Sequence, residues 1–242
     1  MKWKYIITLI LFLSIAINIK AIHLLHASFI KLQSIRTFPS GYIGKNLKEL
    51  QKNVSLNSIT LLGDSRVLMW PQEKFTEKYR VINMAIGGQT SSQLVSQLNA
   101  NIPSKIAFVQ TCINDLHWIN LEHTLHEIIV EQCKSNIKKI VDTLHKRKIT
   151  VILSTIIPPG RPNIFRKLYW PKNIENMLTE INDFILKQKS MNTIILDSEK
   201  ILRESNSIYI QDQYLDSDFY LHINNAAYIK LSNSLNKILL KL

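Results

Sequence analysis

The chain has 242 residues, 46% of them hydrophobic, which predicts one domain with a substantial core together with an appendage. Its formal net charge of +12 comes from scattered Lys and Arg without long runs, and no zinc-finger, RNA-binding or basic-zipper pattern occurs, so no nucleic-acid partner is expected. Such a charge is typical of a solvated surface, and attraction to anionic lipid or polysaccharide is the alternative.

Residues 1–27 form a predicted apolar helix. Two lysines precede an uncharged stretch over 5–19, and this order is typical of a secretory signal. A membrane-spanning helix needs ~20 apolar residues, so the stretch crosses a membrane only if the Lys20 side chain reaches the interface. The cleavage pattern is poor, because the candidate sites at Ala21 and Ala27 each have a large residue two positions earlier. We therefore expect an uncleaved signal anchor with the following domain outside the cytoplasm; secretion after cleavage is the alternative.

Residues 28–54 read as a tether with one short helix, and residues 55–242 as the globular domain. Five segments of this domain are rich in Ile, Val and Leu, as parallel strands covered on both faces are; they are 58–62, 80–86, 105–111, 149–156 and 193–196. Four amphipathic helical patterns alternate with them, at 90–99, 121–146, 174–189 and 225–240, the last with Asn224 or Asn225 as its cap. This alternation predicts a three-layer α/β/α sandwich around a five-stranded parallel sheet.

Chemically distinctive residues follow the ends of these predicted strands, where such a sheet binds its ligands. The first strand is followed by Gly63-Asp64-Ser65, the second by Gly87-Gly88 and the third by Ile113-Asn114-Asp115, while His222 lies in a predicted loop before the last helix. Three of the six glycines fall at these positions, which fits places where the backbone approaches a ligand closely.

These four segments, in this order, resemble the four short blocks of the SGNH, or GDSL, hydrolase superfamily over about residues 56–240. The resemblance implies a flavodoxin-like fold and an ester-cleaving enzyme that needs neither a metal nor a cofactor. It implies Ser65 as the nucleophile and His222 as the general base. It further implies an oxyanion hole formed by the backbone amides of Ser65 and Gly88 and by the Asn114 side chain.

Two positions depart from these blocks. Cys112 stands where the third block begins with glycine, and Phe219 stands three residues before His222, where the last block has aspartate. The nearest acidic residues are Asp218 and Asp216. We expect Asp218 to complete a triad; Asp216, or a dyad without a carboxylate, is the alternative.

The expected chemistry follows from these residue types. Ester cleavage passes through a tetrahedral oxyanion, which preset hydrogen-bond donors stabilise. His222 would take the proton of Ser65 and then pass it to the leaving alcohol. Asp218 would hold the imidazole in the required tautomer.

Other side chains are candidates for substrate contact or for unrelated chemistry. Arg66, Trp70 and Trp118 follow the catalytic segments and are candidates to bind substrate. Core packing is the alternative for the tryptophans, and a surface position for the arginine. The pair His123 and His126 has a spacing that metal sites use, but we interpret it as the exposed polar face of a helix and expect no metal.

The two cysteines, Cys112 and Cys133, exclude a disulfide framework. Cys133 falls at an expected core position of a long helix, so an inert packed thiol is the preferred interpretation. A single bond between the two would require a compartment outside the cytoplasm.

Together these patterns predict a serine esterase that removes acyl groups from a carbohydrate or lipid outside the cytoplasm. An acyltransferase that modifies envelope polysaccharide with the same triad is one alternative, because water and a sugar hydroxyl are both oxygen nucleophiles. A non-catalytic polysaccharide-binding protein is the other, given the displaced acid and Cys112. The sequence does not indicate an oligomeric state.

Overall fold

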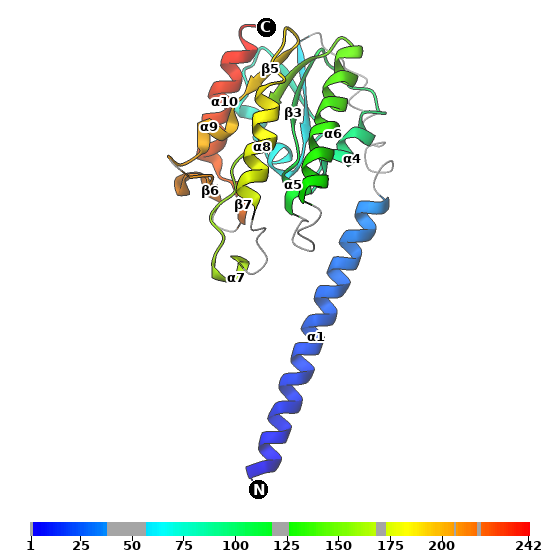
Figure 1. Cartoon of the computed structure of the whole chain (residues 1–242), viewed down its shortest axis with the longest axis vertical. Helices are drawn as coiled ribbons and strands as arrows, with labels where there is room; N and C mark the ends of the chain where they lie inside the picture. The colour runs from blue at the N-terminus through cyan, green and yellow to red at the C-terminus, as the bar shows by residue number, and fades with distance from the viewer. Residues whose placement is uncertain (1, 38–56, 118–125, 168–172, 206, 217–218) are drawn as a thin grey trace. The chain divides into compact units, whose positions relative to one another are not determined.

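The computed structural model forms two compact units, Met1–Lys48 and Glu49–Leu242. The residues that it describes are 2–37, 57–117, 126–167, 173–205, 207–216 and 219–242 (Figure 1). The predicted tether over 28–54 therefore lies largely outside the described residues.

The described part of the first unit is one long helix, α1 (Lys2–Thr37). It extends ten residues beyond the predicted end at residue 27, because no glycine or proline interrupts the chain before Pro39. Residues Trp3–Leu25 are apolar enough to cross a membrane, and none of this stretch is buried against protein. Its 23 residues span about 35 Å as a helix, against the ~30 Å hydrocarbon thickness of a bilayer. This helix fits a signal anchor and a signal peptide equally.

The second unit is built on a five-stranded parallel sheet with the strand order β2-β1-β3-β4-β5. The strands are β1 (Ser58–Gly63), β2 (Arg80–Asn83), β3 (Ile106–Gln110), β4 (Thr150–Ser154) and β5 (Thr193–Leu196). From β1 the chain proceeds to one side into β2 and returns on the other side into β3. This reversal makes the carboxyl ends of β1 and β3 a topological switch point, the place where sheets of this type bind ligands.

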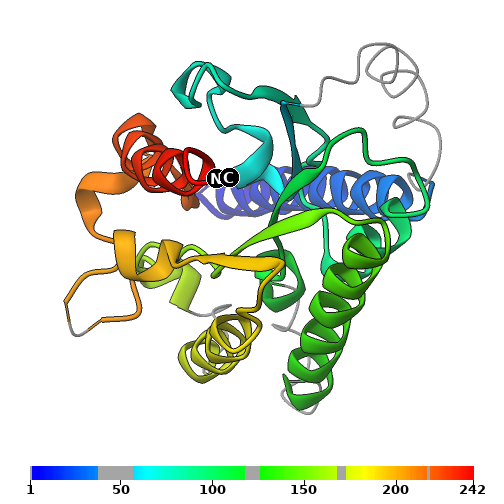
Figure 2. The ribbon, with the colours of Figure 1, turned by 90° about the horizontal axis from the view of Figure 1, so that it is seen from above.

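Helices cover both faces of the sheet. Figure 2 shows α6 and α8 on one side of the strands and α10 on the other. The helices of this unit are α3 (Ser65–Leu68), α4 (Ser91–Gln97), α5 (Ile113–His117), α6 (His126–Lys146), α7 (Ile164–Lys167), α8 (Ile174–Leu186), α9 (Ser198–Leu202) and α10 (Asn225–Leu239), with 3₁₀ turns η1 (Gln72–Lys74) and η4 (Asp212–Tyr214). The predicted three-layer α/β/α sandwich is confirmed.

The alternation of side chains along the strands divides the core between the two faces. Ile59 and Leu61 of β1 belong to the cluster that packs against α10. Leu231 and Leu235 of α10 lie one helical turn apart in the same cluster and are fully buried. Removing one of these leucine side chains is expected to cost about 2–5 kcal/mol. The core thus fixes the sheet edge on which the candidate site lies.

A small antiparallel pair precedes α10. Strand β7 (Phe219–Ile223) pairs with β6 (Leu215–Asp216), so His222 lies on a strand and the predicted loop at this position is wrong. Asn224 caps α10, as predicted, by accepting a hydrogen bond from the Ala227 amide. Its side-chain amide also donates to the carbonyl oxygen of Leu215 at 3.0 Å. The cap and the strand pair therefore hold the segment that carries the histidine.

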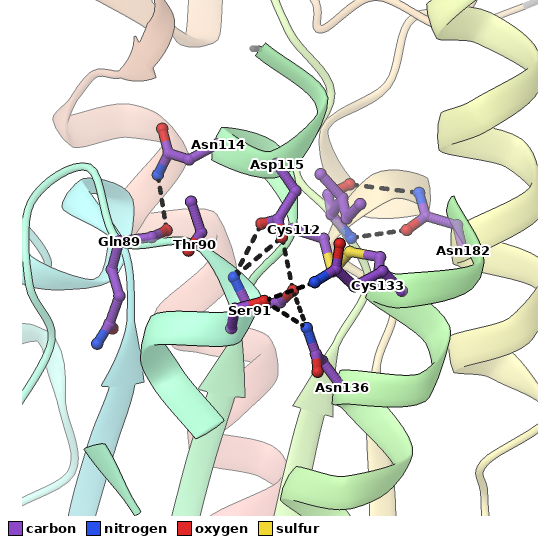
Figure 3. The surroundings of a disulfide bond; sticks show 12 residues. Gln89, Thr90, Ser91, Cys112, Asn114, Asp115, Cys133, Asn136 and Asn182 are labelled. Atoms are coloured by element: carbon purple, nitrogen blue, oxygen red, sulfur yellow. Dashed lines mark hydrogen bonds between the residues drawn. A yellow bond between two sulfur atoms is a disulfide. The ribbon is translucent and has the colours of Figure 1, made fainter. Parts of the chain in front are cut away.

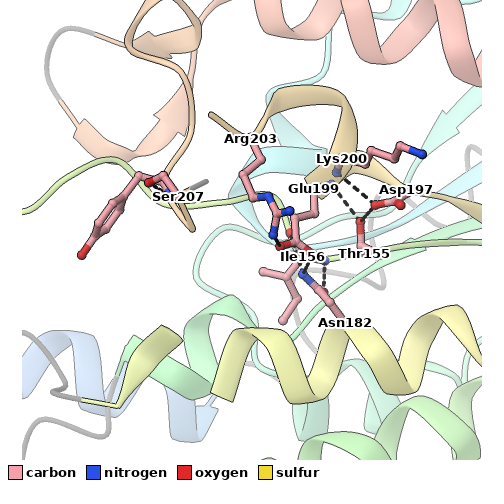
Figure 4. A network of polar contacts seen from close by, with 9 residues as sticks. Thr155, Ile156, Asn182, Asp197, Glu199, Lys200, Arg203 and Ser207 are labelled. Carbon is pink, nitrogen blue, oxygen red and sulfur yellow. Dashed lines mark hydrogen bonds and ion pairs between the residues drawn. The ribbon is translucent and has the colours of Figure 1, made fainter. Parts of the chain in front are cut away.

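A buried polar network fixes the chain after β4 (Figure 4). The Asn182 side chain of α8 accepts from the Ile156 amide at 2.7 Å and donates to the Glu199 carboxylate at 2.7 Å. The Glu199 amide donates in turn to the Thr155 hydroxyl at 2.9 Å. These bonds join α8 to the ends of β4 and β5. They fix the backbone at Thr155 and Ile156, directly before Ile157, whose carbonyl oxygen accepts a hydrogen bond from the Arg66 side chain.

Candidate active site

The expected nucleophile, Ser65, is the first residue of α3, directly after β1. A side chain at Gly63 would place its Cβ 2.4 Å from the Gln110 carbonyl oxygen and 2.6 Å from a Val67 methyl carbon, so only glycine fits. Asp64 caps α3, because its carboxylate accepts from the Arg66 amide at 2.9 Å. The strand, the glycine and the cap together turn the chain sharply at the sheet edge.

His222 faces this turn from β7. Its Nε2 lies 3.0 Å from the Ser65 Oγ, although the two residues are 157 positions apart in the sequence. Burial, and secondarily the charge of Arg66, lower the pKa of the imidazole, whereas the Asp216 carboxylate raises it. The result is a ring that is neutral near neutral pH. A neutral imidazole at this distance is arranged to accept the serine proton.

The expected triad acid, Asp218, lies outside the described residues. Asp216 is described, and it lies on β6 opposite Phe219 of β7. Its carboxylate acts on the histidine through its charge. The assignment of the acid to Asp218 therefore stays a prediction.

The two further oxyanion candidates lie next to each other. Gly88 has φ +74°, a left-handed conformation that glycine adopts without strain, in the turn after β2. The Asn114 side-chain amide of α5 donates to the carbonyl oxygen of the adjacent Gln89 at 3.0 Å (Figure 3). A primary amide carries two N–H groups, so the second remains for another acceptor.

A polar cluster that the sequence did not reveal fastens α5 to its neighbours. The Asp115 carboxylate accepts from the Ser91 amide at 2.9 Å and from the Ser91 hydroxyl at 2.6 Å. The Asn136 amide of α6 donates to the same hydroxyl at 2.9 Å. Burial raises the pKa of the Asp115 carboxyl, and its bonds to Ser91 oppose that rise. The only sequence signal for this cluster is the position of Asp115 beside Asn114.

Two of the candidate substrate contacts lie inside the protein, so that prediction is wrong for them. Arg66 is 1% exposed; its Nε donates to the Leu221 carbonyl oxygen at 2.7 Å, and its Nη1 donates to that of Ile157. Trp70 is 2% exposed and donates through Nε1 to the Ser232 hydroxyl at 2.8 Å. Arg66 lies on α3, and Trp70, two residues after that helix, packs against Phe108 of β3 and Tyr228 of α10. Trp118 lies outside the described residues.

Solved structures share this architecture at low sequence identity. A protein of Streptococcus pneumoniae described as a platelet activating factor is 21% identical, with a TM-score of 0.67 over 91% of this chain and 98% of its own. A GDSL-like lipase from Bacteroides thetaiotaomicron is 17% identical, with a TM-score of 0.65 over 84% of this chain and 98% of its own. The carbohydrate acetylesterase Est24 from Sinorhizobium meliloti is 12% identical, with a TM-score of 0.54 over 76% of this chain and 99% of its own. No protein-family model and no curated protein sequence matches the chain.

The chain has the fold of the SGNH, or GDSL, hydrolases. The resemblance that the sequence blocks indicated is thereby confirmed at the level of the fold. Ser65 and His222 meet at the carboxyl edge of the parallel sheet of this fold.

The cysteines depart from the expectation. Cys112 and Cys133 are joined in a disulfide, with their Cα atoms 6.1 Å apart, so the predicted packed thiol at Cys133 is wrong. Cys112 also has φ +84°, which costs a residue with a side chain about 1–3 kcal/mol. Asp115 lies close to both sulfur atoms. The sulfurs are bonded to each other and the carboxylate is bonded to Ser91, so this group is not a free set of metal ligands.

An open pocket of about 480 Å³ lies beside the end of β7. Its lining mixes apolar and polar side chains: Met69, Pro71, Leu215, Asp216, Ile223, Asn224, Asn225 and Tyr228. Leu68 and Met69, just after the serine turn, are both about half exposed. Among the described residues, the lining includes Ile223, which follows His222 along β7, but neither His222 nor Ser65.

Proposed function

We propose that the domain is a serine-dependent ester hydrolase. The observation that carries this proposal is the 3.0 Å contact between His222 Nε2 and Ser65 Oγ. This contact also favours catalysis over a non-catalytic polysaccharide-binding role, since such a role has no use for a base beside a serine hydroxyl.

The reaction proceeds in two halves through an acyl-serine intermediate. Ser65 Oγ attacks the ester carbonyl carbon while His222 takes its proton. Ser65 and Gly88 donate backbone N–H groups to the oxyanion, and Asn114 donates a side-chain N–H. The tetrahedral intermediate collapses, and the protonated imidazole gives its proton to the leaving alcohol oxygen. His222 then takes a proton from a water molecule, whose oxygen attacks the acyl carbon. The bond from this carbon to Ser65 Oγ breaks, the imidazolium returns its proton to Oγ, and the acyl group leaves as a carboxylic acid.

Asp218 is the proposed third member of the triad. A carboxylate beside an imidazole holds it in the tautomer that leaves Nε2 free to accept a proton, and it stabilises the imidazolium that forms. Asp216 is the alternative, because its charge already acts on His222.

The proposed substrates are acylated carbohydrates or lipids outside the cytoplasm. Neighbours with this fold include a GDSL-like lipase and a carbohydrate acetylesterase. The α1 helix supports a membrane anchor, or secretion after its removal. The Cys112–Cys133 bond supports the location, because disulfides persist mainly in oxidising compartments.

Two measurements on the detergent-solubilised full chain test this function. Turnover of p-nitrophenyl acetate and covalent labelling by a serine-reactive phosphonate are expected in the wild type and in a Ser96→Ala control, which alters an exposed serine of α4. Both are expected to disappear in Ser65→Ala. A wild type with neither turnover nor labelling would contradict the proposal. Acyl transfer to an added oligosaccharide that outruns hydrolysis would instead assign the site to an acyltransferase.

A further inference from the structure

Cys112 has an unusual backbone conformation for a residue with a side chain. Its φ of +84° lies in the left-handed region, which glycine adopts freely and other residues avoid. Among the described residues other than glycine, only Lys148 shares a positive φ. The conformation matters because Cys112 follows β3 closely and lies two residues before Asn114.

Two bonds hold Cys112 in this conformation. Its carbonyl oxygen accepts from the Leu116 amide at 3.2 Å, which closes the first turn of α5. Its sulfur is bonded to that of Cys133 on α6 (Figure 3). Cys133 is fully buried between neighbouring core residues of α6 such as Val130 and Ile137, so the packing of α6 holds its sulfur atom in place.

The position of Asn114 depends on this turn. The chain passes from Cys112 directly into α5, which presents the Asn114 amide 3.0 Å from the Gln89 carbonyl oxygen. Hydrogen-bond donors stabilise an oxyanion only when they are preset where its charge develops. A misplacement of about 1 Å can cost about 10²-fold in rate.

We propose that the Cys112–Cys133 disulfide is a positioning element for the oxyanion hole. It keeps Cys112 in a conformation that glycine would supply without help, and it thereby holds Asn114 in place. This inference rests on the proposed esterase function. It also gives a physical reason for a cysteine at a position where the resembling sequence block carries glycine: the covalent link to α6 replaces the missing conformational freedom.

Two double variants that both lack the Cys112–Cys133 disulfide distinguish a role of this bond in positioning Asn114 from a general stabilisation of the fold. Cys112→Gly with Cys133→Ala restores a residue that adopts positive φ, whereas Cys112→Ala with Cys133→Ala does not. Both should lose thermal stability relative to the oxidised wild type, because both lose the cross-link. The Gly variant should keep its kcat within a few-fold of the wild type. The Ala variant should lose about 10- to 100-fold in kcat with KM little changed, because the oxyanion forms only in the transition state.

A second experiment measures how much Asn114→Ala lowers kcat in the wild type and in each double variant. If the disulfide only stabilised the fold, this cost would be the same in all of them. Removing Asn114 should lower kcat by the same factor in the wild type and in the Gly variant. In the Ala variant it should cost much less, because the donor is already misplaced. Equal costs in all three backgrounds would overturn the inference.

Equal kcat values for the Gly and Ala variants would also overturn it, as would free thiols at both cysteines in protein made under oxidising conditions. If the Ala variant fails to fold, the single variant Cys112→Gly decides. It should retain kcat, and a loss as large as that of Asn114→Ala overturns the inference. A wild type without Ser65-dependent turnover overturns the proposed function and this inference with it, whereas Ser65-dependent turnover combined with equal Gly and Ala variants overturns the inference alone.

Discussion

Arg66 Nε donates a 2.7 Å hydrogen bond to the carbonyl oxygen of Leu221, the residue before His222. The same guanidinium donates to the Ile157 carbonyl oxygen after β4, and the Tyr228 hydroxyl of α10 donates to the carbonyl oxygen of Arg66 at 2.8 Å. Arg66 therefore joins the serine turn, the histidine strand and the end of β4. These bonds tie the residue after Ser65 to the residue before His222, the two side chains that lie 3.0 Å apart.

Replacing Arg66 with Met should damage both activity and stability. The change leaves two buried or partly buried main-chain carbonyls without their donor, which typically costs about 1–3 kcal/mol for each group, and it removes a positive charge that lowers the pKa of the Asp64 carboxyl. We also expect kcat to fall, because the histidine strand loses a tie to the serine turn. Urea unfolding and ester turnover measure the two effects. Lys138→Met, which removes a charge from an exposed ion pair of α6, should change stability by less than about 1 kcal/mol; an equally mild effect at Arg66 would contradict this role.

The burial of Arg66 was beyond prediction from the sequence. Arginine is mostly exposed in proteins. Nothing in the sequence indicates that the carbonyl oxygens of Leu221 and Ile157, from two distant segments, accept hydrogen bonds from the Arg66 side chain. The strands were predictable because their runs of Ile, Val and Leu are themselves the cause of burial on both faces. The serine turn was predictable because Gly63 and Asp64 act locally, through a steric limit and a helix cap.

The disulfide and β7 depend on tertiary structure in the same way. Cys112 and Cys133 are 21 residues apart on different elements, and only the packing of α6 against the sheet brings their sulfurs together. Strand β7 exists because β6, a strand of two residues, pairs with it, and such a short partner leaves no periodic pattern in the sequence. Long-range contacts therefore supply what local patterns do not contain.

Replacing Asn114 with Ala should lower kcat by about 10²–10³-fold, the usual cost of one oxyanion donor. KM should change little, because the donor acts on charge that develops only in the transition state. Steady-state kinetics with p-nitrophenyl acetate measure both constants. Asn99→Ala, at an exposed position after α4, is the matched control and should leave both unchanged. A loss confined to KM would show that Asn114 binds substrate instead.

Asn substitutions at the two candidate acids should separate their roles. Asp218→Asn should lower kcat by up to about 10⁴-fold, because the imidazole loses the group that fixes its tautomer. Asp216→Asn should have a much smaller effect on kcat at neutral pH. If Asp216→Asn is the more damaging change, the triad acid is Asp216.

The dependence of kcat/KM on pH should report the ionisation of His222. Burial and the charge of Arg66 lower the pKa of this histidine from its ordinary value of 6.5. Only the neutral imidazole accepts a proton, so activity should rise with pH and reach half of its plateau below pH 6.5. Asp216→Asn removes a charge that raises the pKa, and the midpoint should move to lower pH. A midpoint above pH 6.5, or an upward movement in Asp216→Asn, would conflict with the geometry of the site.

Asp64 should make the stability of the protein depend on pH. Burial raises the pKa of its carboxyl from 3.8 to about 6, and the charge of Arg66 opposes part of that rise. The folded state therefore binds this proton more tightly than the unfolded state, so the associated stability is fully present below pH 3.8 and is lost as pH rises through about 6. At 1.36 kcal/mol per pKa unit the loss is roughly 3 kcal/mol.

Asp64→Asn tests this directly, because asparagine also caps helices well but does not titrate. Other buried groups, such as Asp115, titrate in both proteins, so the informative quantity is the difference between their unfolding free energies at each pH. Urea unfolding at several values from pH 4 to pH 7 should show the Asn variant gaining most of this roughly 3 kcal/mol relative to the wild type, about 2 kcal/mol across this range. A difference that stays constant with pH would mean that Asp64 ionises in the folded protein at its ordinary pKa, and that the charge of Arg66 compensates the burial fully.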